Sequence, residues 1–78
     1  MKLSMAMRVD YRAGEPIGRA LGFLGNEGPP FRDPKSLAAL ALSCELVRRD
    51  INVWGRFNAV AQDTANGQYY LVRIENDN

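Results

Sequence analysis

The sequence predicts an α+β protein in which a small antiparallel sheet carries one helix packed on one face. Residues 3–12 alternate between apolar and polar, residues 34–49 have the composition of a helix, and residues 51–75 read as a β-hairpin. The 78 residues predict a single domain, 1–78, that buries only about 60% of its unfolded surface. We expect the order β-β-α-β-β, with β-α-β-β as the alternative.

Residues 3–12 predict a half-buried strand, because every second side chain is apolar. The side chains expected on its core face are Leu3, Met5, Met7, Val9 and Tyr11. Those expected on its other face are Ser4, Ala6, Arg8, Asp10 and Arg12.

Residues 17–24 fit the spacing of either a helix or a strand. Gly18 and Gly22 weaken a helix by about 1 kcal/mol each, so we favour a second strand. Residues 25–32 are rich in glycine and proline and predict a loop. We expect Phe31 to dock this loop onto the core.

A helix is expected to begin at Asp33-Pro34 and to run to about Arg49, because Asp is a good N-cap and Pro suits the first helical position. Its core stripe at helical spacing is Leu37, Leu40, Ala41, Cys44 and Val47. Leu42 and Leu46 lie roughly opposite this stripe, where they are either covered by the 25–32 loop or exposed to a partner. We favour coverage, because small monomers rarely leave contiguous apolar patches bare.

The hairpin signal is Asn66-Gly67, a pair that suits a two-residue type I′ turn. This turn would place Ala65 opposite Gln68, Asp63 opposite Tyr70, Ala61 opposite Val72 and Ala59 opposite Ile74. One face would then be a core made of Phe57, Ala59, Ala61, Tyr70, Val72 and Ile74. The other face is mixed and is expected to meet solvent or a partner; it holds Arg56, Asn58, Val60, Gln62, Tyr69, Leu71, Arg73 and Glu75.

Composition argues against catalytic and cofactor chemistry. The chain has no histidine and one cysteine, which leaves no disulfide, no zinc ligand set and no base beside Cys44. No phosphate-binding loop is present. No pattern singles out a carboxylic acid of raised pKa paired with an ionised carboxylate, as acid–base catalysis would need. We therefore expect no enzyme activity, no cofactor and no metal. A net charge of +1 argues against a DNA mimic, and no apolar run approaches the roughly 20 residues of a membrane span, so we expect a cytoplasmic protein.

The candidate partner-binding surface is the mixed sheet face, where the basic side chains expected together are Arg8, Arg12, Arg56 and Arg73. Tyr69 lies among them, and interfaces favour arginine and tyrosine. The alternative is a solvated face whose arginines pair with Asp10 and Glu75. The same set suits RNA binding, but a single aromatic residue and a near-neutral charge favour a protein partner. Trp54 either wraps around the core edge or, if exposed, anchors an interface.

In type, the chain resembles the small phage-encoded anti-CRISPR proteins: it has their size, a lone α/β domain, no cofactor chemistry and an arginine-tyrosine sheet face. These proteins share no common motif, so the resemblance transfers no residue. It implies an inhibitor that binds a subunit of a type I CRISPR-Cas surveillance complex and blocks target DNA binding or nuclease recruitment. The alternative is a small nucleic-acid-binding or regulatory module that uses the same face. We expect a monomer or a weak homodimer.

Overall fold

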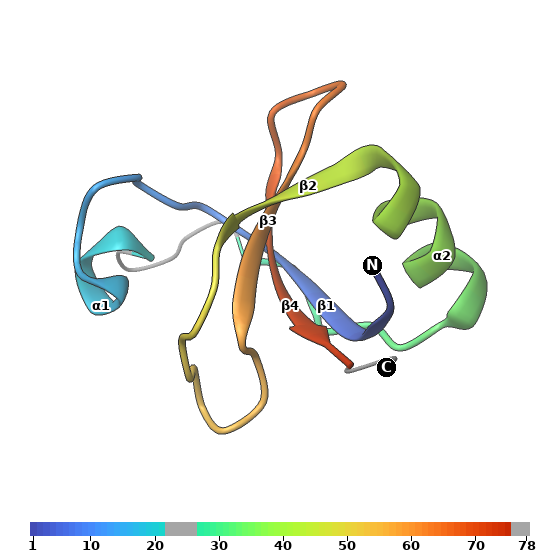
Figure 1. Ribbon diagram of the computed structural model, residues 1–78, viewed down its shortest axis with the longest axis horizontal. Coiled ribbons are helices and arrows are strands. Elements are labelled where there is room, and N and C mark those ends of the chain that lie inside the picture. Colours follow the sequence, from blue (N-terminus) through green and yellow to red (C-terminus); the bar gives the residue numbers. More distant parts are fainter. Residues whose placement is uncertain (22–26, 76–78) are drawn as a thin grey trace.

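The sheet of the protein has four antiparallel strands in the order β1-β4-β3-β2, and helix α2 packs on one of its faces (Figure 1). The computed structural model describes residues 1–21 and 27–75. The elements are β1 (Leu3–Val9), α1 (Ile17–Ala20), α2 (Pro34–Ser43), β2 (Cys44–Arg48), β3 (Ala59–Asp63) and β4 (Tyr69–Ile74). The predicted fold class is therefore confirmed, whereas neither predicted order of elements is correct.

Helix α2 begins where the sequence predicts and ends earlier. The carboxylate of Asp33 accepts hydrogen bonds from the backbone N–H and hydroxyl of Ser36 at 2.9 and 2.8 Å. These bonds hold the pKa of Asp33 below its usual value. The predicted continuation to residue 49 is wrong, because residues 44–48 form β2 and pair with β3. The carbonyl of Ser43 instead accepts from the Thr64 backbone N–H at 3.0 Å, which turns the chain into the sheet.

The expected second strand over residues 17–24 is also wrong where it can be compared. Residues 17–20 form α1, a single helical turn, and Ala20 and Leu21 are buried. The rest of that prediction, residues 22–24, and the first part of the predicted loop, residues 25–26, lie outside the described residues. α1 and α2 lie on opposite sides of the sheet (Figure 1).

The β3–β4 hairpin is confirmed, but its turn has four residues instead of two. Asp63 pairs with Gln68 through an N–H···O bond of 2.8 Å, and the carbonyl of Asp63 accepts from the Gly67 N–H at 2.8 Å. Gly67 takes a positive φ of 77°, and Asn66 is not among the positive-φ residues. Ala59 therefore pairs with Val72, and Ala61 with Tyr70. This shift by two residues leaves the side chains of β3 and β4 on their predicted faces. The predicted face of Phe57 is wrong, because Phe57 precedes β3 and packs in the cluster opposite to that of Ala59 and Ala61.

Both faces of the sheet carry a buried apolar cluster, which corrects the expectation of a solvated face. The cluster on the α2 side contains Leu3, Ala6, Leu37, Leu40, Ala59, Ala61 and Val72. The cluster on the α1 side contains Met5, Met7, Val9, Leu21, Val53, Phe57, Val60 and Leu71. Val60 and Leu71, which were expected on the solvated face, have no exposed surface.

A register shift between Leu3 and Met5 explains one change of face in β1. Leu3 packs with Ala6 in the α2-side cluster, whereas Met5, Met7 and Val9 pack on the α1 side. A bulge puts one extra residue into the strand, so the alternation of side chains changes phase there. The predicted common face for Leu3 and the other apolar residues of β1 is therefore wrong.

The described part of the 25–32 loop runs along the outer edge of β1. Phe31 and Ala6 exchange backbone bonds of 2.8 and 3.0 Å, and Phe31 packs against the α2-side cluster as predicted. The described part of the loop therefore follows β1 and does not cover Leu42. Leu42 is 91% exposed, and Leu46 is half-buried on β2.

Candidate functional site

A tight turn at the end of the sheet presents the single tryptophan of the chain. Val53 and Phe57 exchange two backbone hydrogen bonds of 3.0 and 3.1 Å, and both side chains are buried in the α1-side cluster. The side-chain amide oxygen of Asn52 accepts a hydrogen bond from the Gly55 N–H at 2.9 Å, and this bond spans the turn. We call residues 51–58 the Trp54 hairpin. The buried residues Val53 and Phe57 fix the position of the turn between them.

Trp54 has an unusual backbone conformation and a largely exposed side chain. Its φ is 56°, next to a φ of 67° at Gly55. A bulky residue at positive φ is a strained outlier, and such strain collects at functional sites. The indole is 62% exposed and contacts the Phe57 ring edge-on, with centroids 6.2 Å apart. Because a glycine or asparagine would suit this turn better, the backbone geometry does not account for a tryptophan at the tip.

Two arginines lie beside this tip. The Nη1 atom of Arg73 donates to the carbonyl oxygen of Arg56 at 3.2 Å. Its Nε atom lies 3.8 Å from a carboxylate oxygen of Glu75. Arg56 and Arg73 are both exposed, so the ion pair is a weak surface contact. We call Trp54, Arg56 and Arg73 the tip surface.

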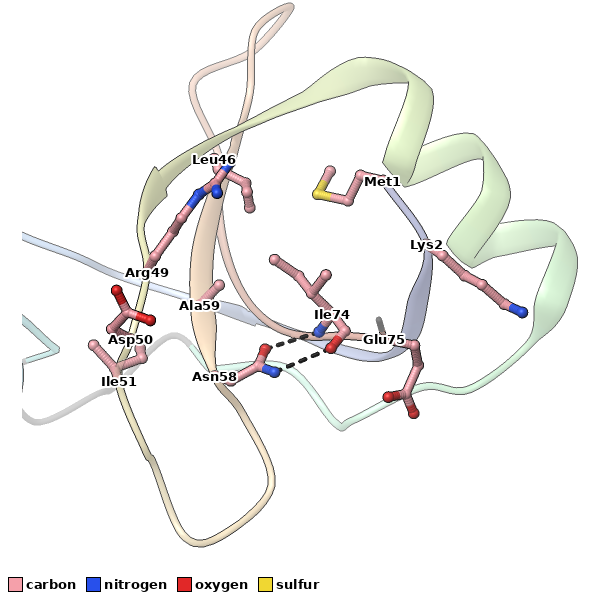
Figure 2. Close-up of a pocket in the computed structure, with 10 residues that line it drawn as sticks. All are labelled: Met1, Lys2, Leu46, Arg49, Asp50, Ile51, Asn58, Ala59, Ile74 and Glu75. Carbon is pink, nitrogen blue, oxygen red and sulfur yellow. Dashed lines mark hydrogen bonds between the residues drawn. The ribbon is translucent and has the colours of Figure 1, made fainter. Parts of the chain in front are cut away.

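An open groove adjoins the tip surface on the α2 side of the sheet, where α2 leaves the sheet face uncovered (Figure 2). Its volume is about 810 Å³. Its lining residues are Met1, Lys2, Leu46, Arg49, Asp50, Ile51, Asn58, Ala59, Ile74 and Glu75. Two cations and two carboxylates among them balance in charge. Glu75 belongs to the groove and also pairs with Arg73, so the groove and the tip surface share a border.

Asn58 fixes the floor of this groove. Its amide nitrogen donates to the Ile74 carbonyl at 3.0 Å, and its amide oxygen accepts from the Ile74 N–H at 2.8 Å (Figure 2). The side chain thus replaces a backbone pair at the end of the β3–β4 ladder. Its backbone N–H also donates to the Val72 carbonyl at 3.0 Å. The Trp54 hairpin is therefore tied to β4 at its base.

The structure brings together only two of the five residues predicted to bind a partner. Arg56 and Arg73 meet in the tip surface. Tyr69 is half-buried, packs against the α1-side cluster and contacts the Tyr11 ring at a centroid distance of 5.1 Å. It is therefore a packing residue more than an exposed contact.

Arg8 and Arg12 lie apart from the tip surface. Arg8 pairs in register with Tyr70, so it lies on the α2 side of the sheet, opposite to the side of Tyr69 and Arg73. Arg12 follows β1 and donates to the Arg19 carbonyl at 3.2 Å. The premise of one arginine face is wrong, because β1 pairs with β4 in a register that puts Arg8 beside Tyr70.

The sequence held a signal for the Trp54 hairpin that the prediction did not use. Asn52 and Gly55 stand three residues apart, with the apolar residue Val53 between them and Phe57 two residues after Gly55. This spacing is typical of a side-chain-capped turn. The turn at Asn66-Gly67 was the stronger local signal, and residues 51–58 were included in the hairpin predicted around it.

The remaining chemistry of the described residues is sparse. Burial raises the pKa of the Cys44 thiol; a hydrogen bond with Ser43 opposes the shift and the Asp63 carboxylate adds to it. A raised pKa leaves little thiolate at neutral pH. No group of three side chains suited to hold a metal occurs within residues 1–21 and 27–75. In the same residues, no helix is long and apolar enough to cross a membrane.

No protein-family model, curated protein or solved structure matches the chain.

Proposed function

We propose that this protein is a non-enzymatic binding protein whose contact surface is the tip surface, Trp54, Arg56 and Arg73. The observation that carries the proposal is a tryptophan that is 62% exposed and held at a φ of 56°. Tryptophan and arginine are the residues that most often dominate binding energy at protein interfaces. The buried residues Val53 and Phe57 hold the backbone of the turn in place, so little backbone entropy is lost on binding.

The proposed partner is a subunit of a type I CRISPR-Cas surveillance complex in the cytoplasm of a host bacterium. The resemblance in type to anti-CRISPR proteins supports this choice, and no residue-level match does. Occupation of the complex would block target DNA binding or nuclease recruitment. The adjoining groove extends the surface available to such a partner, because Glu75 joins it to Arg73.

A pull-down of a purified type I surveillance complex with the tagged protein tests both parts. We expect the complex to be retained and to lose target DNA binding or nuclease recruitment. Trp54→Ala and the double variant Arg56→Glu/Arg73→Glu should each lower retention at least tenfold. The matched control is Arg12→Glu/Arg32→Glu, which makes the same charge change at exposed residues away from the tip surface.

Three results would contradict parts of the proposal. If the complex is not retained, the proposed partner is wrong for the system tested. If retention survives the tip variants and fails in the control, the surface is wrong. If the protein instead retains RNA or DNA, with log affinity falling steeply with log salt, the nucleic-acid-binding alternative replaces the protein partner, because counterion release produces that slope.

A further inference from the structure

A second, smaller pocket lies on the α2 side of the sheet, at the opposite edge from β2. Arg8 on β1 stands directly opposite Tyr70 on β4. The Gly28 N–H donates to the Arg8 carbonyl at 2.9 Å, so the 28–31 segment passes along the other side of Arg8. The pocket between them has a volume of about 310 Å³ and is lined by Arg8, Gly28, Pro29, Phe31 and Tyr70. We call it the Arg8 pocket.

The walls of the Arg8 pocket are flat and apolar. The rings of Phe31 and Tyr70 stand edge to face, with centroids 6.4 Å apart and an interplanar angle of 88°. Pro29 adds a third ring. This volume is at the small end of the usual range for ligand pockets, about 300–1,000 Å³, and it suits a ligand with a single small ring.

Two polar groups of the lining residues have no protein partner within residues 1–21 and 27–75. Arg8 forms no ion pair there, since the pair that occurs joins Arg73 to Glu75. The hydroxyl of Tyr70 makes no hydrogen bond there either. Burial raises the pKa of Tyr70, with smaller contributions from Cys44 and Asp63, while Arg8 opposes the shift. At neutral pH the phenol is therefore a neutral hydrogen-bond donor.

The position of the Arg8 side chain is constrained by the segment beside it. A Cβ atom added at Gly28 would lie 3.4 Å from the Arg8 Cβ, 3.7 Å from its Nε and 3.9 Å from its Nη2. These are ordinary van der Waals distances, so the segment at Gly28 lies beside the arginine from its Cβ to its guanidinium. Among the described lining residues, Arg8 is the one that carries a charge, so these residues together have a net charge of +1.

We infer that the Arg8 pocket binds a small aromatic carboxylate, with the ring between Phe31, Tyr70 and Pro29 and the carboxylate on Arg8. Guanidinium and carboxylate form paired, charge-assisted hydrogen bonds. A dianionic phosphate ester fits less well, because one cation would leave half of its charge unbalanced. This inference is independent of the tip surface, which shares no residue with the pocket.

Titration with benzoate, followed by amide and arginine side-chain NMR signals, tests the inference. We expect saturable shifts of the Arg8 Nε–H and Gly28 N–H signals. Benzyl alcohol, the neutral counterpart of similar shape, should give shifts at least tenfold weaker. Arg8→Gln should weaken benzoate binding at least tenfold, whereas Arg32→Gln, an exposed arginine outside the pocket, should leave it unchanged.

A second variant keeps the Arg8 guanidinium and fills part of the Arg8 pocket with a larger side chain. Gly28→Val should block benzoate, because its side chain would contact the Arg8 stem. The NMR spectrum of each variant shows directly whether its fold is intact. The inference is overturned if benzyl alcohol binds as well as benzoate, if binding persists in Arg8→Gln, or if the shifts do not saturate. Trp54→Ala should not change benzoate binding, so this test and that of the proposed function fail separately.

Discussion

Replacing Trp54 by glycine and by alanine separates its backbone strain from its packing. Both variants lose the same indole, which is 62% exposed, and burying the remainder of a tryptophan stabilises by about 2 kcal/mol at about 25 cal/mol per Å². The edge contact with Phe57 adds about 1 kcal/mol. This packing loss is common to both variants and cancels in their difference.

The difference between the two variants comes from the backbone. At a φ of 56°, alanine retains a left-handed strain of about 1–2 kcal/mol that glycine does not have. Glycine costs about 0.4–1 kcal/mol through its freer unfolded chain. We therefore expect Trp54→Gly to be more stable than Trp54→Ala by about 1 kcal/mol, the reverse of the usual order of these two residues.

Urea unfolding followed by far-UV circular dichroism measures this difference, since the variants lack the single tryptophan needed for fluorescence. With a slope of about 1 kcal/mol per M, the midpoint of the glycine variant should be higher by about 1 M. Ala39→Gly in α2 is the control, and there glycine should cost about 1 kcal/mol. An alanine variant as stable as the glycine variant would refute the strain at Trp54.

Three further predictions concern stability and reactivity. Asn58→Asp should cost about 2 kcal/mol at pH 7, because it removes the donor to Ile74 and sets a carboxylate against that carbonyl; urea unfolding should show a smaller loss near pH 4, where the carboxyl gains a proton. The lowered pKa of Asp33 means that its cap stabilises the fold above about pH 4 and that this contribution is lost as the pH falls through the folded-state pKa; the pH dependence of the urea midpoint should be smaller in Asp33→Asn. Alkylation of Cys44 by iodoacetamide at pH 8 should be slow in the folded protein and accelerate in urea, because burial raises the pKa of the thiol; equal rates would contradict its partial burial.

The parts of the fold that follow from local rules were predictable from the sequence. The cap at Asp33-Pro34, the alternation in β1 and the glycine-bearing turn after β3 each depend on residues close in the chain. The end of α2 was not predictable in this way. Residues 44–48 have apolar and polar residues at spacings compatible with either structure, and their pairing with β3 decides the outcome. Tertiary contacts override a weak local preference there.

The candidate site was only partly predictable for a similar reason. Arg56 and Arg73 were assigned correctly to a shared surface, because Arg56 precedes β3, Arg73 lies in β4, and these two strands pair with each other. Arg8 was misplaced, since its neighbour across the sheet is set by the register between β1 and β4. The burial of Val60 and Leu71 depends on Val53, Phe57 and other residues outside β3 and β4 that pack over them. No periodicity within a single stretch reports such a covering segment.

The pairing of β1 with β4 has a consequence for synthesis of the chain. Leu3 lies opposite Ile74 and Val9 opposite Tyr69, so the first strand to be translated pairs with the last. At about 5–20 residues per second, roughly 3–12 s pass between the translation of these two strands. During that time the apolar side chains of β1 have no partner strand. The nascent chain therefore presents an unpaired apolar strand during this time, and the native sheet closes only after β4 has been synthesised.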